Sequence, residues 1–140
     1  MRKILFKGAA SGLIMGIALF IMGAITARLI YGPQMMPDGK FEPEQINVLY
    51  FLWTKLVIGL FFGIIFTWIY SKFYSLISLP NVLKGLLFSF ILWLIISMWD
   101  ISHPLMFDKD FINKDRIFWT IYTLSSFLIY GVFIGLIYRK

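Results

Sequence analysis

The chain has 140 residues, of which 60% are hydrophobic and 14% charged, and its mean hydropathy is +0.84. Soluble domains contain roughly 45–50% apolar and about 25% charged residues, so this composition excludes a soluble globular protein. The sequence has no cysteine and one histidine, which excludes disulfide scaffolds, thiolate metal sites, iron–sulfur clusters and multi-histidine zinc sites.

Four apolar segments, separated by charged and proline-containing breaks, make up most of the chain. Only helices and closed barrels span lipid, and a spanning helix takes about 20 apolar residues. The segments lack the polar–apolar alternation of barrel strands. We therefore predict an all-α membrane protein, with four transmembrane helices in an up-down bundle that forms a single domain over residues 1–140. The predicted spans are 8–30, 48–70, 82–99 and 117–138.

Prolines and polar residues mark the ends of these spans in chain order. Pro33 ends the first span, and Pro43 favours a start of the second helix near residue 43. Pro104 predicts the end of the third helix, because the residue before a proline is pushed out of the helical conformation. The fourth helix has Asn113 or Asp110 as its candidate N-cap.

The distribution of charge predicts the orientation of the chain in the membrane. With the N-terminus in the cytoplasm, all seven acidic residues fall on the opposite side. The positive-inside rule then places both termini in the cytoplasm, and in a bacterium the membrane is the inner one. The net charge of +6 is a topology signal and does not indicate nucleic acid. The bases assigned to the cytoplasmic side are Arg2, Lys3, Lys7, Lys72, Lys84, Arg139 and Lys140.

Aromatic residues lie near the predicted span ends, as in the aromatic belts of membrane interfaces. The outer group is Tyr50, Trp53, Trp99, Trp119 and Tyr122, and the inner group is Trp68, Tyr70, Tyr74 and Tyr138.

Glycines recur four residues apart on three of the predicted helices. Small residues at this spacing share one face and let helix backbones approach closely. The third helix has Gly85 but is otherwise bulky, and we expect its bulky face to fill the grooves that the glycines leave. Lys7-Gly8 and Lys84-Gly85 also open the first and third helices alike, which suggests two repeated hairpins. The predicted packing glycines are Gly8, Gly12, Gly16, Gly59, Gly63, Gly131 and Gly135.

Ionisable residues near the outer span ends are the candidates for chemistry. Asp100 and His103 are three residues apart on one helical face, which suits a proton relay or half of a metal site, or else a polar helix end. Arg28 and Lys55 either extend to the interface or join Asp100 in an outer-face ionisable cluster. The hydroxyl groups within the spans are interpreted as packing groups. No complete metal site and no cofactor are expected.

The plan resembles the small, uncharacterised four-helix membrane proteins of the domain-of-unknown-function type that occur widely in bacteria. The likeness lies in the glycine-spaced first helix, Gly59 and Gly63 in the second, Lys84-Gly85 opening the third, and Gly131 and Gly135 in the fourth. The resemblance implies the same four-helix fold and no known activity.

These observations favour a non-enzymatic protein, because an accessory subunit needs helix surfaces rather than clusters of titratable groups. We expect a small subunit of a larger membrane complex, with membrane lipid and other integral membrane subunits, or a second copy of itself, as partners. The alternative is a small transporter or channel with Arg28, Lys55, Asp100 and His103 lining an outer vestibule. A membrane enzyme ranks third.

Overall fold

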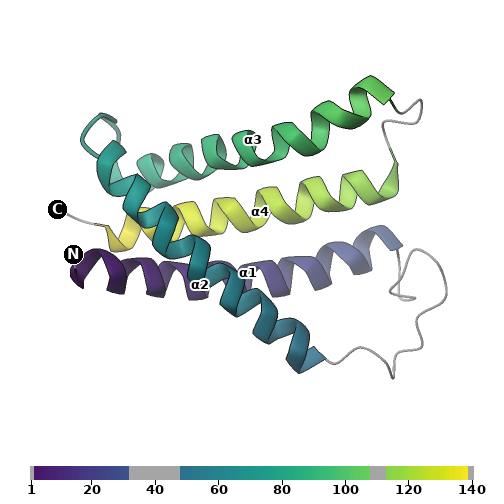
Figure 1. The fold of residues 1–140 in the computed structure, drawn as a ribbon, viewed down its shortest axis with the longest axis horizontal. Helices are drawn as coiled ribbons and strands as arrows, with labels where there is room; N and C mark the ends of the chain where they lie inside the picture. The colour runs from purple at the N-terminus through teal and green to yellow at the C-terminus, as the bar shows by residue number, and fades with distance from the viewer. Residues whose placement is uncertain (1, 32–47, 108–112, 139–140) are drawn as a thin grey trace.

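The computed structural model describes residues 2–31, 48–107 and 113–138, with the side chains of residues 2, 3, 31 and 99–107 left undescribed. Its helices are α1 (Arg2–Tyr31), α2 (Val48–Phe73), α3 (Asn81–Phe107) and α4 (Lys114–Ile137) (Figure 1). All four are long and apolar enough to cross a membrane, which confirms the predicted all-α fold with four candidate spans and indicates an integral membrane protein.

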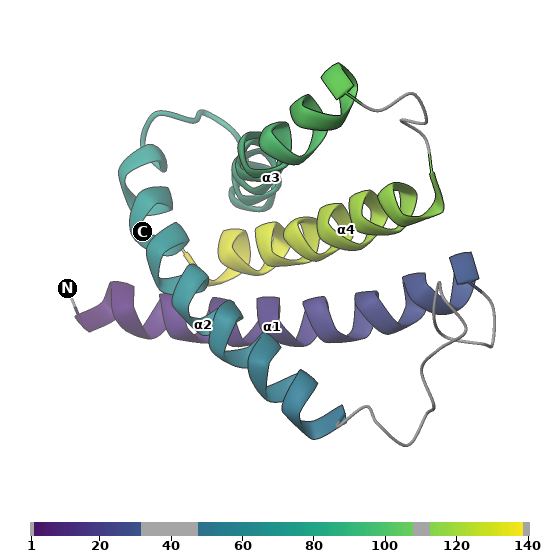
Figure 2. The ribbon, with the colours of Figure 1, turned by 45° about the vertical axis from the view of Figure 1, so that its right-hand side comes forward.

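The helices are arranged in the spatial order α2, α1, α4, α3. α1 packs against both α2 and α4, and α3 packs against α4. The two termini and the connection between α2 and α3 share one end of the molecule, here called the terminal end, and the opposite end is the distal end (Figure 1). α2 and α3 approach each other at the terminal end and diverge towards the distal end (Figures 1 and 2).

Two predicted helix ends are tested by the backbone. The prediction that Pro104 ends the third helix is wrong, because α3 continues through Pro104 to Phe107. A proline removes one helical hydrogen bond and its ring crowds the carbonyl of the preceding turn, and membrane helices tolerate this where other groups satisfy the freed carbonyl. The N-cap at Asn113 is confirmed, since its side chain accepts a hydrogen bond of 2.9 Å from the Arg116 backbone N–H. Pro33, Pro43 and Asp110 lie outside the described residues.

Backbone contact between glycines joins α1 to α2. A Cβ atom added to Gly12 would lie 2.5 Å from the carbonyl oxygen of Gly59, and one added to Gly8 would lie 2.8 Å from Cα of Ile64. One added to Gly16 would lie 2.6 Å from the carbonyl oxygen of Lys55. These distances leave no room for a side chain, so the two backbones touch along Gly8, Gly12 and Gly16. Helices packed this way cross steeply, as α1 and α2 do in Figure 1.

The second hairpin, α3 with α4, is joined by small residues on both helices as well as by bulky residues of α3. Phe88 and Trp93 are buried, and the Trp93 indole N–H donates to the Thr123 hydroxyl of α4 at 3.0 Å. Cβ atoms added to Gly85 and Gly131 would each run into the partner helix, Gly85 at Gly131 and Gly135. Gly131 lies against Gly85 and Ser89, and Gly135 against Asn81. α3 therefore offers its own small polar stripe at four-residue spacing, which the search for glycines alone did not reveal.

The α1–α2 hairpin and the α3–α4 hairpin are packed through the same pattern of glycine contacts. The two patterns do not align at the Lys-Gly pairs near the starts of α1 and α3, as the sequence suggested. Gly12 lies against Gly59 and Gly63, and Gly85 lies in the same way against Gly131 and Gly135. Gly85 therefore corresponds to Gly12 rather than to Gly8, a shift of one helical turn.

Replacement of Gly63 by alanine tests the glycine contact. An added Cβ would overlap Cα of Gly12, so we expect Gly63→Ala to lower the free energy of unfolding in detergent by about 1–3 kcal/mol, the usual cost of overpacking. Gly23→Ala is the matched control, because its Cβ would meet only the Tyr122 ring at 3.2 Å, which is free to shift. Equal stability of the two variants would contradict the contact.

Candidate functional site

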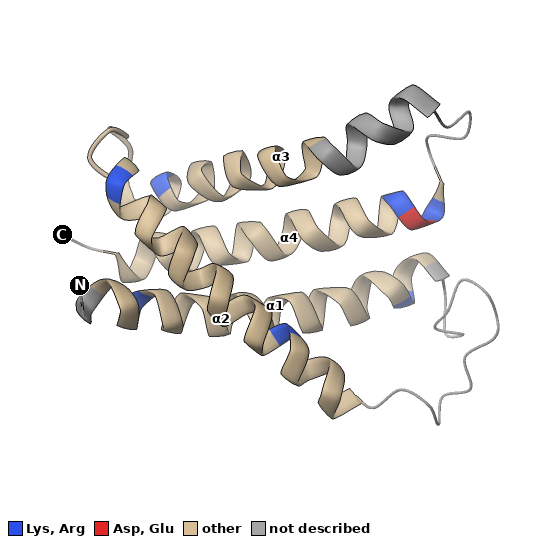
Figure 3. Ribbon diagram, in the orientation of Figure 1, with Lys and Arg blue, Asp and Glu red and all other residues tan. Residues whose placement is uncertain are grey.

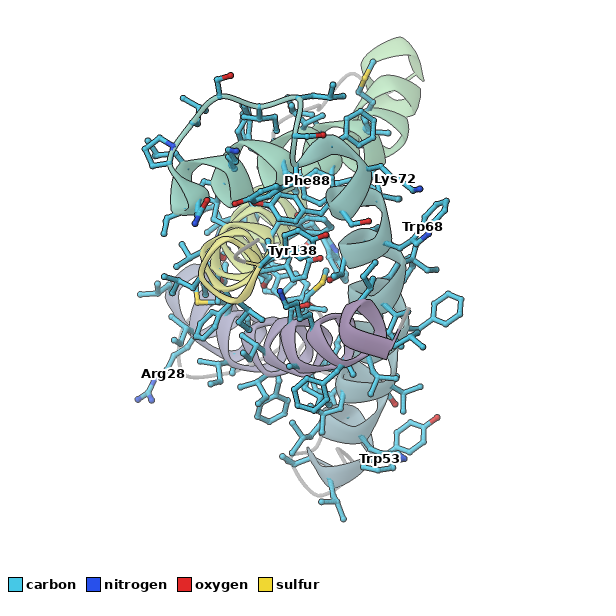
Figure 4. All side chains as sticks on the ribbon, turned by 90° about the vertical axis from the view of Figure 1, so that its left-hand side faces the viewer. Arg28, Trp53, Trp68, Lys72, Phe88 and Tyr138 are labelled. Atoms are coloured by element: carbon cyan, nitrogen blue, oxygen red, sulfur yellow. The ribbon has the colours of Figure 1, made fainter. Side chains whose placement is uncertain are left out.

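Three tyrosines, Tyr70, Tyr74 and Tyr138, form a buried cluster at the terminal end, here called the tyrosine cluster. Their ring centroids lie 5.1–5.6 Å apart, and Phe88 of α3 packs 5.0 Å from Tyr70. Figure 4 shows Phe88 and Tyr138 directed into the space between the helices. The belt interpretation is therefore wrong for these three tyrosines, whose exposed fractions are 0%, 9% and 8%.

The belt interpretation is wrong for one of the remaining aromatic residues and holds for four others. Tyr122 is also buried, at 4% exposed, whereas Tyr50, Trp53, Trp68 and Trp119 are exposed as belt residues should be. The side chain of Trp99 lies outside the described residues.

Two lysines from different helices cover the tyrosine cluster. The Lys7 ammonium of α1 lies 4.7 Å from the Tyr138 ring centroid, and that of Lys84 of α3 lies 4.2 Å from the Tyr74 ring centroid. Lys84 also donates to the Tyr74 carbonyl oxygen at 3.2 Å, and the Tyr74 hydroxyl donates to the Asn81 side chain at 2.6 Å. Cation–π contacts of this kind, with these hydrogen bonds, tie all four helices together at the terminal end.

A chain of buried hydroxyl groups lies deeper in the bundle. The Ser11 and Thr67 hydroxyl oxygens are 3.1 Å apart, and those of Thr67 and Tyr130 are 3.4 Å apart. All three residues are fully buried, and they come from α1, α2 and α4. Ser11 also donates to the Lys7 and Gly8 carbonyl oxygens, at 2.9 and 3.2 Å. The packing interpretation covered Ser11 and Thr67, and the structure adds Tyr130 as the third member of one interhelical network.

The Tyr70 hydroxyl differs from its neighbours. It is buried and has no hydrogen-bond partner among the residues that the structure describes. Most buried polar atoms in proteins have a hydrogen-bond partner. A buried hydroxyl without one either lowers the stability of the fold or binds a small polar molecule.

The predicted outer-face cluster is only partly described. Arg28 is exposed and projects away from the bundle in Figure 4. The Lys55 ammonium lies instead over aromatic rings, 5.0 Å from Phe51 and 5.6 Å from Tyr122. No described contact joins Arg28 to Lys55, and the side chains of Asp100 and His103 lie outside the described residues.

The chemistry available at the terminal end is hydrogen bonding and cation–π attraction. Its described groups include phenols, aliphatic hydroxyls, ammonium ions, the Asn81 amide and the Trp68 indole. Within the described part of the chain, no three histidine, aspartate or glutamate residues gather where they would hold a metal ion. The sequence carried one usable signal. Tyr70 and Tyr138 lie near the ends of their helices with a basic residue close by, and Lys7 and Lys84 lie within the first two turns of theirs.

Comparisons with known proteins do not extend this picture. No family model matches the chain, and neither the curated proteins nor the solved structures contain a significant match. Four apolar helices are therefore the part of the bacterial resemblance that the structure supports.

The hydroxyl chain is tested by replacing its central member. Thr67→Val keeps the shape of the side chain and removes both contacts, and we expect a loss of about 0.6–1.7 kcal/mol in stability, the range of interhelical hydrogen bonds in membranes. Thr54→Val is the control, because Thr54 bonds only to the Tyr50 carbonyl of its own helix. Chemical unfolding in detergent measures the stability of both variants. A double-mutant cycle of Thr67→Val and Tyr130→Phe that gives no coupling energy would contradict the network.

Tyr70→Phe is expected to act in the opposite direction. Removing a buried hydroxyl without a partner relieves its desolvation cost, so the variant should be as stable as the native chain or more stable by up to about 1–3 kcal/mol. The same unfolding experiment measures this change. A clear loss of stability would show that the hydroxyl has a partner.

Proposed function

We propose that the protein is a non-catalytic subunit that packs against, and helps to assemble, a larger complex in the bacterial inner membrane, with both termini in the cytoplasm. Close-packed helix pairs hold its own fold together. The remaining helix faces are free to meet other transmembrane helices.

The exposed face of α2 supports this proposal most directly. α2 buries Gly59, Gly63, Phe66, Thr67 and Tyr70, which contact the rest of the bundle. Its opposite side carries the α2 stripe, namely Trp53, Val57 and Phe61, which are 66%, 54% and 61% exposed. Residues four apart share one helix face. Figure 4 shows Trp53 projecting away from the bundle, where a neighbouring helix has access.

The composition of the α2 stripe suits a protein partner. Helices in lipid associate mainly through van der Waals packing, and large aromatic side chains provide many such contacts. Trp53 and Phe61 offer such side chains on either side of Val57. Because Val57 is smaller, the surface has a shallow depression there, into which a side chain of another helix can pack. The α2 stripe thus has the form of a contact surface for an integral membrane subunit.

The buried hydroxyl chain favours a small transporter as the second candidate. Polar groups inside a membrane bundle often mark the path of a substrate or ion. Ser11, Thr67 and Tyr130 meet where three helices converge, so a pathway would pass through them. In this alternative Arg28, Lys55, Asp100 and His103 lie nearer the outer entrance.

A photo-reactive amino acid at position 61 tests the subunit proposal. We expect it to crosslink the tagged chain, in native membranes, to one integral membrane protein that also co-purifies in stoichiometric amount after gentle solubilisation. The same group at Ile121 of α4, which is 47% exposed, is the matched control. Purification of the chain alone or as a homo-oligomer would contradict the proposal. Substrate flux that is lost in Tyr130→Phe vesicles would favour the transporter.

A further inference from the structure

An open groove of about 620 Å³ lies between the start of α1 and the end of α2, at the terminal end. It exists because the helices touch at Gly8 and Ile64 and separate beyond that point. The volume falls within the range of about 300–1,000 Å³ that is usual for small-molecule sites. Its apolar walls are Ile4, Leu5, Ile64 and Ile65, and Trp68 and Lys72 line its polar rim.

The rim carries two hydrogen-bond donors without an acceptor among the described residues. Trp68 and Lys72 are one turn apart on α2, and Figure 4 shows both projecting from the same side of that helix. Both are exposed, and neither the Trp68 indole N–H nor the Lys72 ammonium has a partner among the described residues. The Ser71 hydroxyl donates to the Trp68 carbonyl oxygen at 2.6 Å and so belongs to the helix itself.

The electrostatics of the terminal end favour an anion. Its described charged side chains are Lys7, Lys72 and Lys84, and Figure 3 shows the described acidic residue at the distal end. Lys7 and Lys84 already cover the tyrosine cluster. Among the described lysines of this end, Lys72 is thus the one whose charge is available to a ligand.

We propose that the groove binds an anionic glycerophospholipid of the surrounding membrane. An acyl chain lies against Ile4, Leu5, Ile64 and Ile65, and the headgroup phosphate accepts hydrogen bonds from Trp68 and Lys72. An apolar wall with donors at one end matches a molecule with an apolar chain and a charged head. Basic pockets between transmembrane helices bind anionic headgroups in this way. This inference does not depend on the proposed subunit role.

Native mass spectrometry of the full chain, purified in detergent with equal amounts of phosphatidylglycerol and phosphatidylcholine, tests the site. We expect the native chain to retain phosphatidylglycerol preferentially. Lys72→Ala should lower the bound ratio of the two lipids about fivefold, the contribution of one basic residue near an anionic headgroup. Lys114→Ala is the matched control, because Lys114 is exposed at the distal end and outside the groove.

A second variant tests the apolar wall. Ile65 is 37% exposed, so Ile65→Trp is expected to fold and to fill the groove. It should reduce the retention of both lipids, with thermal unfolding as the check on its fold. Three results would overturn the proposal, namely no lipid preference in the native chain, an unchanged preference in Lys72→Ala, or equal losses in Lys72→Ala and Lys114→Ala. The last result would show general attraction of anionic lipid to a basic protein.

Discussion

At Gly12, Gly59 and Gly63 the backbones of α1 and α2 touch, and the arrangement of the molecule follows from this contact and its counterpart at Gly85, Gly131 and Gly135. Lipid chains are as apolar as leucine, so burial of apolar surface does not drive helices together in a membrane. Close van der Waals packing has to do so. Glycine permits it by removing the side chains that would hold the backbones apart.

The same contact determines where the molecule is open. Helices that touch at glycines cross steeply and separate on both sides of the crossing. On the terminal side of the α1–α2 crossing this separation leaves the groove that ends at Lys72. Towards the distal end α2 diverges from α3 (Figures 1 and 2). The proposed lipid site is thus a consequence of this packing, whereas the α2 stripe is exposed because it lies on the side of α2 opposite to the contact.

Polar and aromatic contacts further restrict how the helices are positioned relative to one another. The tyrosine cluster with Lys7 and Lys84 fastens the helices at the terminal end, and the chain from Ser11 to Tyr130 links three of them further in. Hydrogen bonds are directional, so the Ser11–Thr67 contact adds an angular requirement to the steric fit of the glycines. Together they specify which turn of α1 faces which turn of α2.

The sequence was sufficient for the class of fold, because four long apolar segments leave the backbone no alternative to helices in a membrane. The sequence was insufficient to predict which residues each helix face contacts. A search for glycines did not reveal that Asn81 and Ser89 extend the stripe of Gly85, since small polar residues play the same steric role. Tyr70 and Tyr138 were assigned to the interface by their distance from the span ends, but depth along a helix does not say which side faces the bundle.

Disulfide trapping tests the central claim most directly, because the chain has no native cysteine. The Ser11 and Thr67 oxygens are 3.1 Å apart, so cysteines at these positions are within reach of a disulfide after a small adjustment. The account predicts rapid intramolecular crosslinking of Ser11→Cys/Thr67→Cys in membranes, and none in Ser11→Cys/Thr54→Cys. Crosslinking of the second pair, or of neither, would contradict the glycine register between α1 and α2.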